Sequence, residues 1–65
     1  MIQALYFKDE KINKFWFVET LDCEMMVNYG KTGTIGKYEI KEFDNKQDCE
    51  KEALKLINSK KKKGY

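Results

Sequence analysis

Three glycines spaced three residues apart, from Gly30 to Gly36, interrupt the middle of the chain. Glycine reaches backbone conformations that other residues avoid and lets another backbone approach closely. The residues before and after this stretch read as β-strands, so the glycines predict a hairpin turn. Lys31 lies within this stretch, and Tyr29 and Lys37 flank it. An aromatic ring, two cations and exposed backbone amides would suit the phosphate–sugar backbone of a nucleic acid. The sequence of this segment is therefore compatible with a plain hairpin turn and with a nucleic-acid-binding loop.

Four segments have the character of strands. Residues 15–20 are rich in aromatic and branched side chains, which favour a central strand. Their alternation places Phe15 and Phe17 on one face of a sheet and Trp16 and Val18 on the other. Because the connections are short, neighbouring strands should pair in an antiparallel meander. The expected strands cover residues 2–8, 15–20, 24–29 and 34–43.

The last third of the chain predicts one helix. Asp44 or Asn45 can cap its first turn, and lysines at positions 60–63 suit its negative C-terminal end. We expect Leu56 and Ile57 to be buried against Phe15 or Phe17. The apolar stripe of this helix consists of Cys49, Ala53, Leu56 and Ile57, continued by the stem of Lys60.

These elements predict one small domain over residues 1–65. Its fold class is α+β: an antiparallel sheet of about four strands with one C-terminal α-helix packed on one face. A chain of 65 residues with 42% hydrophobic residues can build one core. Cys49 fits that core as a small residue on the helix, whereas Cys23 lies near a turn.

The residue inventory argues against an enzyme. The chain has no histidine, and its single serine, Ser59, lies in the helix tail, so a Ser–His or Cys–His pair cannot form. We therefore expect no catalytic residues, no metal and no cofactor, since zinc would also lack ligands. Gly30 and Lys31 resemble the end of a P-loop, but Met25 stands where its first glycine is needed.

Charge and hydropathy indicate the kind of partner. The net charge is +2, all thirteen basic residues are lysines, and the surplus lies in residues 31–65. This asymmetry favours an anionic partner for the second half. No secretory signal or membrane-spanning run is visible, so we expect an intracellular protein, cytoplasmic or nucleoid-associated, with no membrane partner.

The order of several short motifs resembles the WGR domain, a module named after its Trp-Gly-Arg signature. The chain has Asn13-Lys14-Phe15-Trp16 near its start, Gly30 and Gly33 in the signature region, Phe43 before the helix, and a closing Lys-x-x-Gly-Tyr. In the signature itself, Tyr29 replaces Trp and Lys31 replaces Arg. Lysine is a point charge and does not reproduce the two-pronged hydrogen bonding of arginine.

The resemblance implies contact with DNA ends, where the signature aromatic packs on a terminal sugar and nearby cations hold the backbone. Trp16 has two interpretations at this point: a core aromatic in a central strand, or an exposed ring that stacks on a base or sugar. The predicted nucleic-acid-binding residues are Lys14, Trp16, Tyr29, Gly30, Lys31 and Lys37.

The sequence therefore predicts a module that binds nucleic acid, DNA more readily than RNA, through lysine–phosphate contacts and a loop aromatic. The alternative is an adaptor that uses its aromatic sheet face and loop to dock a protein partner or a second copy. Salt separates the two hypotheses, because phosphate binding weakens steeply with salt.

Overall fold

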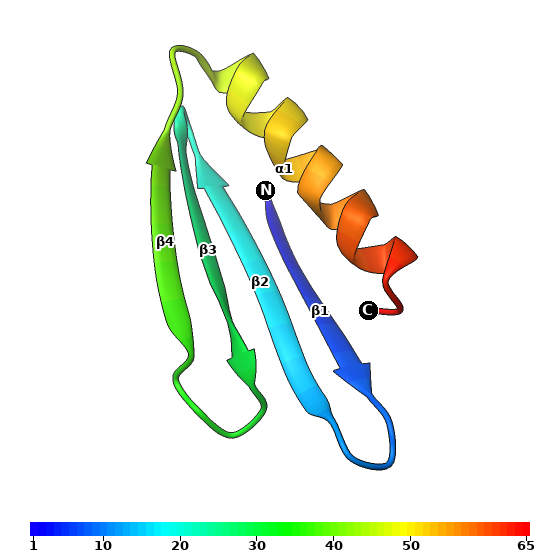
Figure 1. The fold of residues 1–65 in the computed structure, drawn as a ribbon. Helices are drawn as coiled ribbons and strands as arrows, with labels where there is room; N and C mark the ends of the chain where they lie inside the picture. Colours follow the sequence, from blue (N-terminus) through cyan, green and yellow to red (C-terminus); the bar gives the residue numbers. More distant parts are fainter.

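The computed structural model describes all residues, 1–65, and confirms the α+β fold class. A four-stranded antiparallel sheet has the order β1-β2-β3-β4, so each strand pairs with its neighbour in sequence (Figure 1). One helix follows the sheet. The elements are β1 (Ile2–Lys8), β2 (Asn13–Leu21), β3 (Glu24–Lys31), β4 (Lys37–Glu42) and α1 (Lys46–Lys62).

The meander gives the sheet two distinct ends. The loops 9–12 and 32–36 lie together at one end, toward which the C-terminus of α1 also points (Figure 1). We call this the loop end. The turn between β2 and β3 and the connection from β4 to α1 lie at the other end, called the turn end. In the β2–β3 turn, Asp22 adopts a positive φ of 57°, a conformation in which aspartate is enriched.

The helix begins where a capping side chain predicts. Asn45 is the cap: its side-chain oxygen accepts a hydrogen bond from the backbone N–H of Asp48 at 2.8 Å. Asp48 lies in the first turn and lysines 60–62 in the last, which matches the helix dipole. Gly64, at φ +104°, follows the end of the helix.

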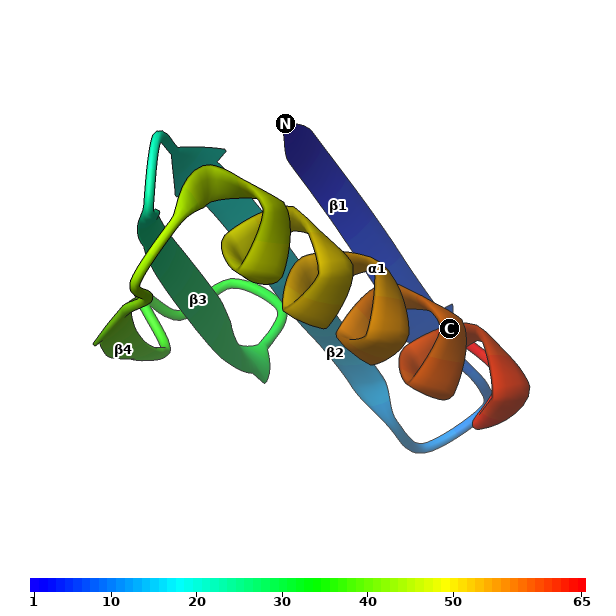
Figure 2. The same ribbon diagram turned by 90° about the horizontal axis from the view of Figure 1, so that it is seen from above.

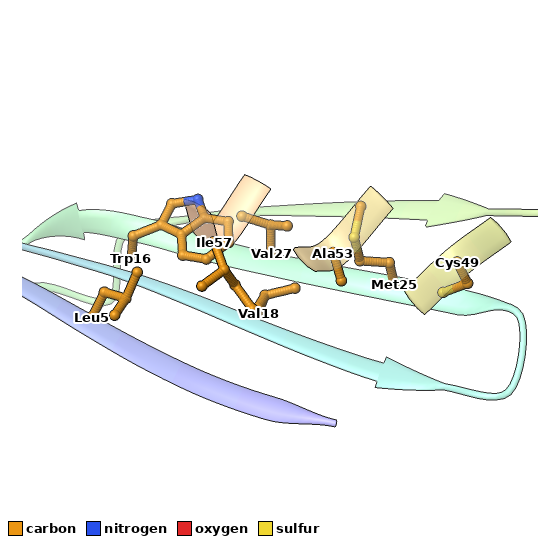
Figure 3. Packing of buried hydrophobic residues seen from close by; sticks show 8 residues of the cluster. All are labelled: Leu5, Trp16, Val18, Met25, Val27, Cys49, Ala53 and Ile57. Carbon is orange, nitrogen blue, oxygen red and sulfur yellow. The ribbon is translucent and has the colours of Figure 1, made fainter. Parts of the chain in front are cut away.

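The helix covers the face of the sheet opposite to the one we expected. Helix α1 lies over β2 (Figure 2) and packs on Trp16 and Val18, which are 3% and 0% exposed (Figure 3). Phe15 and Phe17 alternate with these residues along β2 and therefore lie on the other face. The register explains the choice, because it sets Val18 opposite Val27 and thereby joins the apolar alternation of β2 to that of β3. On the other face, β3 offers less apolar area to a helix.

The core is one cluster between the sheet and α1. Ile57 is buried as predicted, and Cys49 is a fully buried core residue with a free thiol. Leu56 is only half-buried and packs at the edge of the cluster. The eight core residues are Leu5, Trp16, Val18, Met25, Val27, Cys49, Ala53 and Ile57 (Figure 3).

Candidate nucleic-acid interface

The loop end holds a concavity of about 460 Å³. Four of the six predicted binding residues lie in it: Lys14, Tyr29, Gly30 and Lys31. They come from two neighbouring strands, β2 and β3, so the antiparallel pairing brings together residues far apart in the sequence. The full lining is Lys11, Ile12, Asn13, Lys14, Tyr29, Gly30, Lys31 and Tyr65.

Two lysines of this lining lie directly opposite each other in the register of β2 and β3. Lys14 on β2 is directly opposite Lys31 on β3, so their side chains emerge on the same face of the sheet. Like charges directly opposite each other in an antiparallel pair destabilise the sheet. An anion placed between them would offset that repulsion. The concavity is therefore electrostatically suited to a negatively charged group.

Aromatic rings hold Lys14 in place. Its Nζ lies 5.1 Å from the centroid of the Phe7 ring and 5.3 Å from that of the Tyr65 ring. The two rings pack against each other with centroids 5.9 Å apart. Such cation–ring contacts restrict the lysine stem and leave the ammonium available to an anion. Tyr65 is thus a site residue that the prediction missed, although it belongs to the closing Lys-x-x-Gly-Tyr motif.

A third lysine extends the positive surface. Nζ of Lys60 lies 5.9 Å from the Trp16 ring centroid and 5.8 Å from that of Tyr65. Partial burial lowers the pKa of Lys60, and repulsion from Lys63 and Lys14 lowers it further. Part of the predicted lysine run at the helix end therefore lies close to the Lys14–Lys31 pair.

Tyr29 forms one wall of the concavity. It lies opposite Trp16 on one side and Lys37 on the other, and it is half-buried at the edge of the core. Its hydroxyl donates a hydrogen bond to Oε1 of Glu39 at 3.1 Å. This bond, reinforced by the negative charge of Glu39, raises the pKa of Tyr29. The phenol therefore stays protonated, and its hydroxyl is held toward β4.

The glycines serve the packing of the loop. A Cβ on Gly30 would lie 2.8 Å from the Cα of Gly36, so only glycine lets loop 32–36 fold back onto β3. Asn28 holds that conformation by donating hydrogen bonds from Nδ2 to the carbonyl oxygens of Ile35 and Lys37, both at 3.0 Å. The glycine at position 30 is thus required by the close approach of the loop, and Gly30 also lines the concavity.

The two remaining predicted residues lie elsewhere. Trp16 is buried beneath α1, and its ring faces the core (Figure 3). Of the two roles that the sequence left open for it, this placement favours the core role, since a covered ring cannot stack on a base. Lys37 lies across from Tyr29 at the start of β4, next to the concavity but outside its lining.

Loop 9–12 closes the site from the side of β1. Oδ1 of Asp9 accepts hydrogen bonds from the backbone N–H groups of Lys11 at 2.8 Å and Ile12 at 2.6 Å. These two bonds lower the pKa of Asp9, and Lys14 adds a smaller effect in the same direction. A short loop fixed in this way presents Lys11 at the rim of the concavity.

Comparison with known proteins places this geometry in a family. A family model described as the WGR domain matches residues 1–65. The Escherichia coli (strain K12) protein YfeS is 52% identical over 65 residues, or 100% of this chain and 27% of that protein. Protein YehF from the same organism is 44% identical over 59 residues, or 91% of this chain and 22% of its own length.

A solved structure shows the same fold. The crystal structure of a protein from Bacteroides fragilis matches the whole chain with a TM-score of 0.94 and 43% identity, and the match covers 18% of that protein. The chain thus spans 27%, 22% and 18% of the lengths of these three proteins. Its one helix is too short and too polar to cross a membrane.

Proposed function

The chain belongs to the WGR domain family, whose members are nucleic-acid-binding modules, and from this premise we propose that it binds nucleic acid at the loop end. The observation that carries the proposal is the opposed pair Lys14 and Lys31, flanked by the half-buried ring of Tyr29. Two cations on adjacent strands match a phosphate backbone, and a ring beside them matches a sugar or base.

The binding is mainly to the backbone. Lysine delivers a point charge to phosphate, and with no arginine in the chain no guanidinium can grip a guanine edge in two-pronged fashion. The ligand is therefore bound with little dependence on base sequence, with DNA favoured over RNA. A free duplex end exposes a terminal sugar that the Tyr29 ring can cover, so we propose a preference for ends or breaks.

A titration with five ligands tests this function: closed circular duplex, blunt duplex, nicked duplex, single-stranded DNA and RNA. We expect the blunt and nicked duplexes to bind more tightly than the closed circle, and Lys14→Ala and Lys31→Ala each to weaken binding of all sequences about equally. If both variants bind every ligand as the wild type does, the Lys14–Lys31 pair does not contact nucleic acid and the adaptor hypothesis is preferred.

A further inference from the structure

The face of the sheet opposite α1 carries exposed apolar side chains, and no helix of the chain covers it (Figure 2). The register places Tyr6 next to Phe15, and Met26 next to Ile40. Tyr6 is 67% exposed and Ile40 74%, whereas neighbours on the helix side are buried. We call this surface the open face; it consists of Tyr6, Phe15, Phe17, Met26, Tyr38 and Ile40.

The open face is bounded differently at its two ends. At the loop end, loop 32–36 folds over the sheet, so that a Cβ on Gly36 would lie 2.8 Å from Cζ of Phe15. At the turn end there is no such wall. A bound segment that is longer than the face can therefore extend past the turn end but not past the loop end.

Carboxylates gather where the face is unwalled. Glu24 is directly opposite Glu42, and Glu19 lies opposite Met26, so all three project on the same side as the open face. Like charges opposed in this way repel each other, and a cation between them would offset the repulsion. The same charges repel phosphate. The open face is thus suited to a basic protein segment and not to nucleic acid.

The size of the face favours a single helix as its occupant. The strands have 6 to 9 residues, which at ~3.3 Å per residue make the face roughly 20 to 30 Å long, the length of about 13 to 20 helical residues. Four strands ~4.8 Å apart give a projected area of roughly 400 to 600 Å², less than the ~800 Å² that each partner contributes to a stable interface of two flat surfaces. The opposite face already accommodates one helix, α1, in this way.

We propose that the open face docks an amphipathic helix of a partner protein. The helix presents apolar residues at i, i+3 or i+4, and i+7 to the sheet. Lysines or arginines at one of its ends reach the carboxylates of Glu19, Glu24 and Glu42. Since this surface and the Lys14–Lys31 pair lie on opposite faces of the sheet, a docked helix leaves the nucleic-acid interface free.

Selection from a display library of helix-forming peptides, with the purified chain as bait, tests the proposal. Enriched peptides should combine an apolar stripe with terminal lysines or arginines. The affinity of a selected peptide should fall at least tenfold in the double variant Tyr6→Thr/Ile40→Thr, which keeps residues that favour strands. The double variant Glu24→Gln/Glu42→Gln should bind several-fold more weakly and with less dependence on salt.

Controls separate this surface from the rest of the molecule. Leu54→Ser, at an exposed position on α1, should bind the peptide as the wild type does. Circular dichroism checks that each variant is folded. The open-face variants should bind duplex DNA as the wild type does, so that a loss of peptide binding can be distinguished from a loss of nucleic-acid binding. No enrichment, or peptides that bind the open-face variants equally well, overturns the proposal. So does a wild-type dimer that these variants render monomeric, since the occupant would then be a second copy.

Discussion

At the scale of single residues, Tyr29 joins the core to the candidate interface. Its ring packs at the edge of the core while its hydroxyl donates to Glu39. The contribution of the ring can therefore be separated from that of the hydrogen bond.

Tyr29→Ala should weaken binding to a duplex with a free end by ~1–3 kcal/mol, because a stacking surface is lost. Tyr29→Phe keeps the ring and loses only the bond to Glu39, so it should bind nearly as the wild type does. Both should leave the salt dependence unchanged, since no charge is removed. Fluorescence anisotropy with linear and closed circular duplexes measures this, and equal losses for both variants would assign the effect to the hydroxyl.

At position 30, the close packing of loop 32–36 leaves room only for glycine. In Gly30→Ala, the new Cβ would lie 2.8 Å from the Cα of Gly36, so loop 32–36 must move. We expect a loss of ~1–3 kcal/mol in the free energy of unfolding, as for other overpacked sites. Thr32→Ala, in the same exposed loop, should change it by less than about 0.5 kcal/mol. Urea unfolding of both variants provides the comparison; similar midpoints would show that the loop yields without cost.

At the scale of elements, α1 and the sheet enclose the core between them. Ile57→Ala removes a side chain that is 5% exposed and should cost ~2–5 kcal/mol. Leu54→Ala, at a position 51% exposed on the same helix, should cost less than about 0.5 kcal/mol. Chemical unfolding measures both. A small loss for Ile57→Ala would mean that the helix is not docked on the Trp16 face.

The loop between β1 and β2 should respond to acid. Backbone hydrogen bonds from Lys11 and then Ile12 lower the pKa of Asp9 in the folded protein. Its carboxylate therefore stabilises the fold above the unfolded pKa of ~3.9, and this contribution is lost as the pH falls through the lower folded pKa. The urea midpoint of the wild type should fall more steeply below about pH 4 than that of Asp9→Asn. Parallel curves would indicate that these bonds form equally well with a neutral side chain.

The sequence predicted the helix and the strands better than it predicted which face of the sheet the helix covers. Local chemistry and spacing predicted a cap at Asp44 or Asn45, of which Asn45 is the one observed, and they also predicted the buried Ile57 and the four strands. The face covered by α1 did not follow, because β2 is apolar on both sides. Only the pairing with β3, which sets Val18 opposite Val27, decides between them.

In the candidate site, too, local features were predicted from the sequence and contacts between distant segments were not. The loop lysines and Tyr29 could be named from their local sequence, but the opposition of Lys14 and Lys31 depends on strand register. Tyr65 reaches Lys14 only because the helix returns the C-terminus to the loop end (Figure 1). Contacts between distant segments therefore account for what the sequence alone did not predict.

At the scale of the whole molecule, charge is separated along the long axis. The net charge is only +2, yet the loop end carries the opposed lysines and the end of α1, whereas Glu24, Glu42 and Asp48 lie toward the turn end. The longest extent is 41 Å, several times the screening length of ~8 Å at physiological salt. Each end therefore acts on a ligand almost independently of the other.

This separation predicts that the position of a lysine, and not the net charge, determines the salt dependence of binding. If Lys14, Lys31, Lys37 and Lys60 each neutralise one phosphate, log Kobs should fall against log salt with a slope of roughly −3 to −4 for duplex DNA. Lys31→Ala should reduce the magnitude of that slope by ~1. Lys46→Ala removes the same charge at the start of α1, far from the loop end, and should leave the slope unchanged. Titrations of the two variants with duplex DNA at four salt concentrations measure these slopes. Equal slopes for the two variants would mean that binding depends on the overall charge and not on a defined interface at the loop end.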